Sequence, residues 1–120
     1  MTITQQELAH FSGTTQHYYL PNFPNYHYTD GIRYLIHNGA TWLISDIFLY
    51  QRNPAIMKHL EQDYFQHWKL RVNEDNSATL SCDDGNGNII KQWEIDYTDF
   101  PLSEIRFYLI DKVLMLPSEY

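Results

Sequence analysis

The chain has 120 residues and carries 15 acidic against eight basic side chains, which gives a formal charge of −7. Hydrophobic residues make up 43% of the sequence and aromatic residues 16%, so the composition is that of a folded protein rather than a disordered segment. The length corresponds to one domain. The excess of acids disfavours direct binding of nucleic acid, because that affinity depends on Lys and Arg contacts to phosphates.

A single cysteine excludes a disulfide within the chain and a cysteine-based zinc site. Residues 1–7 lack the basic and apolar segments of a signal peptide. No apolar run approaches the roughly 18–20 residues that cross a bilayer. We therefore expect a cytoplasmic protein with no membrane partner.

Residues 1–29 predict a short helix followed by an aromatic arm, which we define as residues 14–29. Thr4 and Glu7 have the spacing of a capping box, and a helix through Phe11 can end near Gly13. The tyrosines of the arm form either an exposed binding surface or a cover over an open side of the sheet, and the pattern favours the cover. The candidate surface residues of the arm are Tyr18, Tyr19, Tyr26 and Tyr28.

Three helices are predicted over residues 30–38, 41–52 and 54–61. The helix over residues 41–52 is apolar on most of its surface, which predicts burial against the sheet or against a second copy of the chain, as in a homodimer. The starts of these three helices are marked by Thr29-Asp30, Thr41 and Asn53-Pro54. The end of the first helix is marked by Asn38-Gly39.

Residues 65–116 predict the sheet around which the chain is organised. Apolar and polar residues alternate along these segments, as Trp68 and Leu70 do with His67 and Lys69, which is typical of antiparallel strands with one solvated face. Asp111-Lys112 is short enough for a hairpin turn. We predict an α+β fold in which a four- to five-stranded antiparallel meander carries short helices on one face.

The sequence contains no recognisable catalytic, cofactor or metal signature. Its six histidines form no HxxxH or HxH pair, and the DDGNGN segment at residues 83–88 is better explained as a hairpin turn than as a calcium loop. Cys82 shares a strand face with Ala78 and is expected to be a small buried hydrophobe. We expect no catalytic residues, no metal and no cofactor.

Charge is distributed unevenly between the two halves of the chain. Residues 61–120 hold twelve acids against five bases, whereas residues 1–60 are neutral. We therefore expect a non-enzymatic interaction or regulatory module that binds a protein partner of basic character through an acidic sheet face. Besides the tyrosines of the arm, the candidate interaction surface includes Asp30, Glu94 and Asp96. The alternative is a small-molecule-binding protein or an unrecognised enzyme, with a pocket between sheet and helices lined by Trp68, Trp93 and tyrosines.

Seven segments of the chain resemble a family of small bacterial proteins known only as a domain of unknown function. The resemblance extends from about Leu8 to Tyr120 and implies a single domain without an established activity, so it assigns no site residues. The loop over residues 21–25 is longer here than in the family. The segments are FSGTTQHYY, YTDGIRYL, TWLISDI, FQHWKL, ATLSCDDGNGN, TDFPLSEIRFYL and LPSEY.

Overall fold

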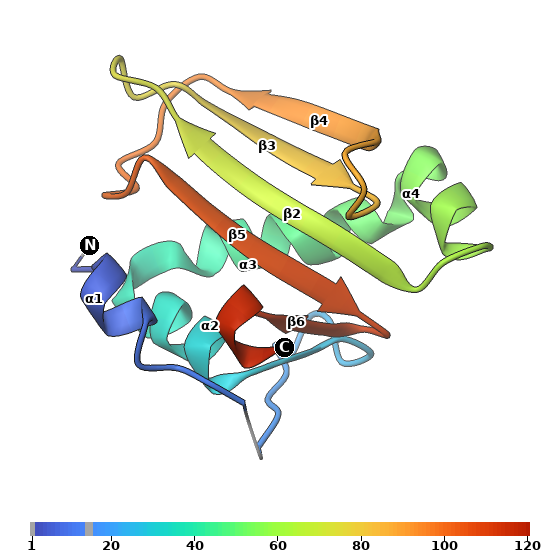
Figure 1. The fold of residues 1–120 in the computed structure, drawn as a ribbon, viewed down its shortest axis with the longest axis horizontal. Coiled ribbons are helices and arrows are strands. Elements are labelled where there is room, and N and C mark those ends of the chain that lie inside the picture. The colour runs from blue at the N-terminus through green and yellow to red at the C-terminus, as the bar shows by residue number, and fades with distance from the viewer. Residues whose placement is uncertain (1, 14–15) are drawn as a thin grey trace.

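The computed structural model describes residues 2–13 and 16–120, and its elements are shown in Figure 1. The helices are α1 (Gln5–Leu8), α2 (Asp30–Leu35), α3 (Thr41–Leu49) and α4 (Pro54–Leu60), with 3₁₀ turns at Tyr50–Arg52 and Pro117–Glu119. The strands are β1 (His27–Tyr28), β2 (Phe65–Val72), β3 (Ala78–Asp83), β4 (Ile89–Ile95), β5 (Glu104–Ile110) and β6 (Val113–Met115).

The sheet has six strands in the order β1-β6-β5-β2-β3-β4. The α+β class is confirmed, but the prediction of a purely antiparallel sheet of four or five strands was wrong. The additional strand, β1, comes from the aromatic arm and pairs parallel to β6, whereas every other pair is antiparallel. The backbone N–H of His27 donates to the carbonyl of Lys112 at 2.8 Å, and that of Thr29 donates to Leu114 at 3.2 Å.

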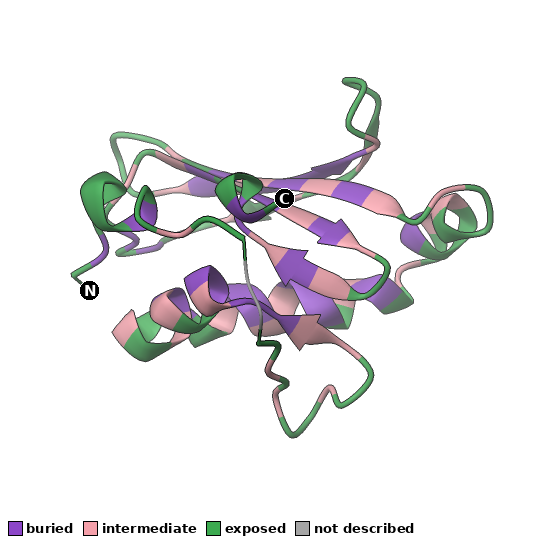
Figure 2. Cartoon of the chain, turned by 60° about the horizontal axis from the view of Figure 1, so that its bottom comes forward, coloured by how far each residue is buried: buried purple, intermediate pink, exposed green. Residues whose placement is uncertain are grey.

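One face of the sheet packs on α3 and forms the core. Trp68, Leu70 and Phe107 are fully buried on this side, as are four residues of α3. Buried and partly exposed residues alternate along β2 and β5, as Figure 2 shows. The broad apolar surface of α3 is thus accounted for by contacts within one chain.

The helical segment follows the predicted boundaries closely. α2 continues through residues 36–40 into α3, with a kink at Asn38 and at Gly39, whose φ of 97° is accessible to glycine at little cost. α4 starts as predicted, because Asn53 Oδ1 accepts the N–H of Ala55 at 2.9 Å. Thr41 is not a cap, since it is already the first residue of α3.

The N-terminal helix is shorter than predicted and ends at Leu8. Thr4 Oγ1 accepts the N–H of Glu7 at 3.2 Å, as expected for an N-cap. Residues 14 and 15, at the start of the aromatic arm, lie outside the described residues. In the described part of the chain, no helix has the length and apolar character needed to traverse a bilayer.

Candidate functional site

The side chains that alternate with the core residues of β2, β3 and β5 point away from α3, and we call this side of the sheet the open face. Figure 1 looks onto it, with α3 passing behind the strands. Strand register brings three of these residues into one row, because His67 pairs with Asp83 on β3 and with Tyr108 on β5. No helix of the described residues covers this row.

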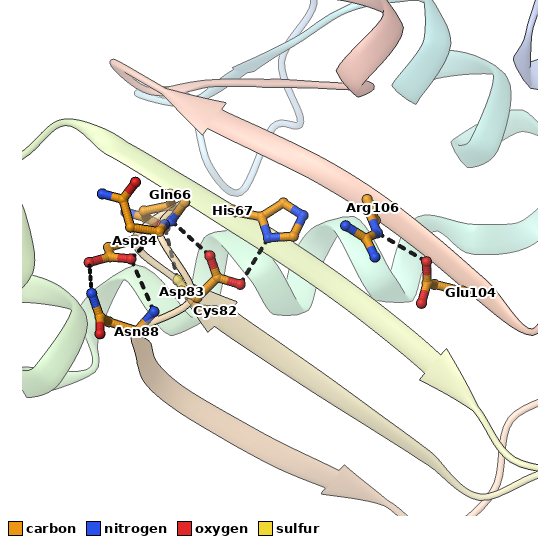
Figure 3. A network of polar contacts seen from close by, with 10 residues as sticks. Gln66, His67, Cys82, Asp83, Asp84, Asn88, Glu104 and Arg106 are labelled. Atoms are coloured by element: carbon orange, nitrogen blue, oxygen red, sulfur yellow. Dashed lines mark hydrogen bonds and ion pairs between the residues drawn. The ribbon is translucent and has the colours of Figure 1, made fainter.

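A histidine–aspartate pair lies at the centre of the row (Figure 3). His67 Nδ1 is 2.9 Å from Asp83 Oδ2, and only 13% and 12% of the two side chains are exposed. The other carboxylate oxygen, Oδ1, accepts the N–H of Gly85 at 2.7 Å. An ionised carboxylate can only accept, so Asp83 places a proton on Nδ1 and leaves Nε2 of a neutral imidazole as the acceptor.

Three aromatic rings cluster on one side of this pair, and Tyr108 is the ring that contacts it. The ring of Phe65 lies 5.1 Å from that of Tyr108, and the ring of Tyr120 lies 5.5 Å from Tyr108, edge to face. Tyr108 also meets the imidazole of His67 edge-on at 5.8 Å. Tyr120 is 78% exposed, so the aromatic cluster, which we define as Phe65, Tyr108 and Tyr120, reaches solvent.

The loop over residues 84–88 is packed onto this cluster. Gly85 has a φ of 86°, and a Cβ at this position would lie 2.6 Å from Cε1 of Phe65, so only glycine fits. Asp84 closes the loop by accepting the backbone N–H of Asn86 at 2.8 Å and the side-chain amide of Asn88. These hydrogen bonds, led by that of Asn88, lower the pKa of Asp84. The loop is a hairpin turn, as predicted.

The remainder of the open face is charged but balanced. Arg106 Nε donates to Glu104 at 3.0 Å, and this hydrogen bond lowers the pKa of the Glu104 carboxyl, with smaller contributions from Lys69 and Arg71. Both partners are well exposed, so the pair itself contributes little stability. The middle of the sheet is therefore not acidic, since three basic residues lie there.

Most acids of the second half lie outside the strands. Of the predicted acidic surface, Glu94 lies on the edge strand β4 and accepts the hydroxyl of Thr79 at 3.0 Å, whereas Asp96 is exposed just after β4. The loop after β4 is joined to the β2–β3 turn by a hydrogen bond from Thr98 N–H to Asn76. Four carboxylates thereby share one end of the sheet, which we call the acidic end: Glu74, Asp75, Asp96 and Asp99.

The four predicted surface tyrosines do not form one exposed patch. Tyr28 is 7% exposed and lies in β1, whereas Tyr19 is 58% exposed. Tyr18 is partly buried, and its hydroxyl donates to Asp30 at 2.8 Å. Tyr26 stacks on Phe48 of the core at 5.3 Å. The arm thus mainly covers the edge of the core.

The place expected for a pocket between Trp68 and Trp93 is filled by stacked rings. Tyr50 stacks on Trp93 at 4.0 Å, and Trp93 stacks on Trp68 at 5.6 Å. Trp68 is fully buried, and its indole N–H donates to Gln66. A separate cavity of about 220 Å³ lies beside Gln66, between α4 and the β5–β6 hairpin.

The His67–Asp83 pair was not predicted, although the hairpin contained the signal for it. Once the turn is placed at residues 73–77, Val72 pairs with Ala78, and counting back along both strands pairs His67 with Asp83. Chemically, the arrangement orients an imidazole for hydrogen bonding. Within residues 2–13 and 16–120, no three His, Cys, Asp or Glu side chains are grouped to hold a metal ion.

Comparison with known proteins gives one result. The family of unknown function DUF6876 matches residues 2–120, which is nearly the whole chain. No curated protein and no solved structure matches the chain. The open face, the acidic end and the cavity beside Gln66 are therefore features of a member of the DUF6876 family of unknown function, to which this chain belongs.

Proposed function

We propose that this protein is a non-enzymatic interaction module that binds a protein partner through the open face of its sheet. The observation that carries the proposal is the solvent-accessible aromatic cluster around the His67–Asp83 pair. Aromatic side chains dominate protein interfaces because they bury large areas while few rotamers are frozen. The cluster is preorganised, since Gly85 is packed against Phe65 and the carboxylate of Asp83 fixes the imidazole of His67.

Polar groups around the cluster supply the rim that a protein interface needs. Lys69 and Arg106 lie in neighbouring strands one row away from His67, and Glu104 accepts from Arg106. Such a rim sets orientation and association rate more than affinity.

The proposal is tested by site-specific photo-crosslinking in cells that produce the protein. A benzophenone amino acid replaces Tyr120 in one variant and Tyr97 in a matched control, because both tyrosines are highly exposed but only Tyr120 belongs to the aromatic cluster. We expect a defined crosslinked partner from position 120 and not from position 97. An identical set of products from both positions would contradict the proposal.

The identified partner is then used in a binding measurement with purified proteins. Tyr120→Ala should weaken binding by roughly tenfold or more, as for an exposed aromatic anchor. Tyr97→Ala should leave the affinity unchanged. Because both side chains are mostly in solvent, neither change should lower the melting temperature by more than a degree or two. Equal affinities for the two variants would show that the open face is not the interface.

A further inference from the structure

The cavity beside Gln66 has a polar floor and apolar walls. It has a volume of about 220 Å³, and its floor is formed by Gln51, from the turn after α3, and by Gln66 of β2. Both glutamines are at least 95% buried. The walls are mainly apolar and come from Tyr26, Leu60, Tyr64 and Leu109, and the β5–β6 turn adds one acid and one base, Asp111 and Lys112. The site faces the core side of the sheet, so it is separate from the open face.

The orientation of both glutamine amides is fixed by their neighbours. The indole N–H of Trp68 can only donate, and it lies 2.8 Å from Oε1 of Gln66, so this atom is the carbonyl oxygen. The backbone carbonyl of Ile47 can only accept, and it lies 3.1 Å from Nε2 of Gln51, so this atom is the amide nitrogen.

The two amides then bind each other reciprocally. Gln51 Nε2 donates to Gln66 Oε1 at 2.9 Å, and Gln66 Nε2 donates to Gln51 Oε1 at 2.8 Å. Gln66 Oε1 thus accepts from both Gln51 and Trp68, and Gln51 Nε2 donates to both Gln66 and Ile47, so neither atom has a hydrogen-bonding position left. Two capacities are not used by any described residue: the second N–H of Gln66 and the second lone pair of Gln51 Oε1.

These two unused groups are adjacent. Because Gln66 Nε2 and Gln51 Oε1 are bonded to each other at 2.8 Å, the outward N–H and the outward lone pair lie on the same side of the amide pair. The opposite side of the pair is the one that Trp68 and Ile47 occupy. Both side chains line the cavity, and we infer that this side of the pair, with one donor next to one acceptor, forms its floor.

We propose that this cavity binds a small uncharged ring that carries an N–H next to a C=O, that is, a lactam or cyclic imide. The ligand carbonyl accepts from Gln66, and the ligand N–H donates to Gln51. Tyr26, Leu60 and Leu109 provide the apolar walls that such a ring needs. A carboxylate does not fit, because one of its oxygens would meet the lone pair of Gln51, and an ammonium ion would meet the N–H of Gln66.

The direct test is an NMR titration of the full chain with 2-pyridone, followed by the side-chain amide signals of Gln51 and Gln66. The matched control is 1-methyl-2-pyridone, which keeps the ring and the carbonyl but lacks the N–H. We expect saturable shifts with 2-pyridone at high micromolar to low millimolar concentration, and at least about tenfold weaker binding of the methylated ring. Equal binding of both rings, or no shifts with either, would overturn the proposal.

Two protein variants distinguish binding in the cavity from binding elsewhere on the protein. Leu60 is 40% exposed at the mouth, so Leu60→Trp should fill the cavity while leaving the amide pair intact. Met57, on the same helix and 54% exposed, does not line the cavity, so Met57→Trp is the matched control. We expect at least about tenfold weaker 2-pyridone binding only in Leu60→Trp. Unchanged binding in Leu60→Trp would place the ligand elsewhere and overturn the assignment.

Discussion

Glu119 accepts the backbone N–H of Gly31 through Oε2 at 3.0 Å, although 88 positions separate the two residues. The same carboxylate accepts the hydroxyl of Thr29 at 2.7 Å and the N–H of Leu116 at 3.0 Å through Oε1. It is 6% exposed, and its position at the start of α2 lets the helix dipole and the free N–H groups stabilise the charge. Glu119 thus caps α2 in place of the local threonine and joins it to the 3₁₀ turn after β6.

The contact leaves no room for a side chain at position 31, so Gly31→Ala should destabilise the protein. An added Cβ would lie 2.6 Å from Cδ1 of Leu116 and would also collide with the carboxylate of Glu119. Overpacking of this kind costs about 1–3 kcal/mol, against about 1 kcal/mol gained from helix propensity, and displacement of Glu119 removes hydrogen bonds as well. Chemical denaturation should show a net loss. A variant as stable as the wild type would show that Glu119 has room to withdraw.

Glu119→Gln tests the carboxylate without changing its size. The amide can still accept from Thr29 and Leu116 through one oxygen, but its NH₂ group would face the N–H of Gly31, donor against donor. We expect a loss of about 1–3 kcal/mol in the free energy of unfolding, from one buried unsatisfied donor and the lost charge at the helix start. Ser118→Ala, an exposed neighbour, should be nearly neutral.

Local signals explain why the starts of α2, α3 and α4 were predicted correctly, although α1, α2 and α3 end earlier than predicted. Asn53 caps α4 through a hydrogen bond to Ala55, and the kink falls at Gly39, so both boundaries depend on residues that are adjacent in the sequence. The β2–β3 register was equally accessible, because the turn between the strands fixes it. It follows that His67 and Asp83 could have been paired from the residues of the hairpin alone.

Features that depend on distant segments could not be predicted. β1 has only two residues, too few to show an alternation of apolar and polar side chains. It forms because the N–H of His27 donates to the carbonyl of Lys112. The cap of α2 was assigned to Thr29, whose hydroxyl instead donates to Glu119. The Gln51–Gln66 pair could not be predicted either, because two polar residues are buried there only with hydrogen bonds to Ile47 and from Trp68.

The hairpin between β5 and β6 contains backbone strain that substitution can relieve. Asp111 and Lys112 have φ of 47° and 67°, the left-handed values of a type I′ turn, which favours Asn-Gly. Changing the pair to Asn-Gly should raise the free energy of unfolding by about 1 kcal/mol and the melting temperature by a few degrees. Lys112→Ala removes the same side chain but keeps a Cβ, so it should give no gain. A gain from alanine would point to the lysine charge instead of the backbone.

Asp46 should make the protein less stable as the pH rises, whereas a carboxylate in an ion pair makes a protein more stable. Burial raises the pKa of Asp46, so the folded state binds its proton more tightly than the unfolded state. The resulting penalty is absent below the ordinary pKa of aspartate, develops as the pH rises through the raised value, and is fully present at neutral pH. Asp46→Asn should therefore stabilise the protein at neutral pH and have no effect well below the ordinary pKa of aspartate, as measured by denaturation under both conditions.

The same substitution has a second readout in Tyr50. Burial raises the pKa of Tyr50 first, and the negative charge of Asp46 raises it further. Asp46→Asn should lower this pKa, which an absorbance titration of the phenolate can follow. An unchanged tyrosine titration together with an unchanged stability would show that the carboxylate of Asp46 is hydrated in solution.

Cys82 should be chemically silent in the native protein. It is fully buried in β3, and its thiol lies 3.9 Å from Gln66 Oε1 as a weak donor. Burial raises the pKa of this thiol strongly, with a smaller contribution from Asp83, and the thiolate is the reactive form. Ellman's reagent should therefore react at least about a hundredfold more slowly with the native than with the denatured protein, because opening of the core must come first. Addition of denaturant below the unfolding transition should accelerate the reaction in proportion to the population of opened molecules. Fast stoichiometric labelling without denaturant would mean that β3 separates from its neighbours far more easily than its buried position implies.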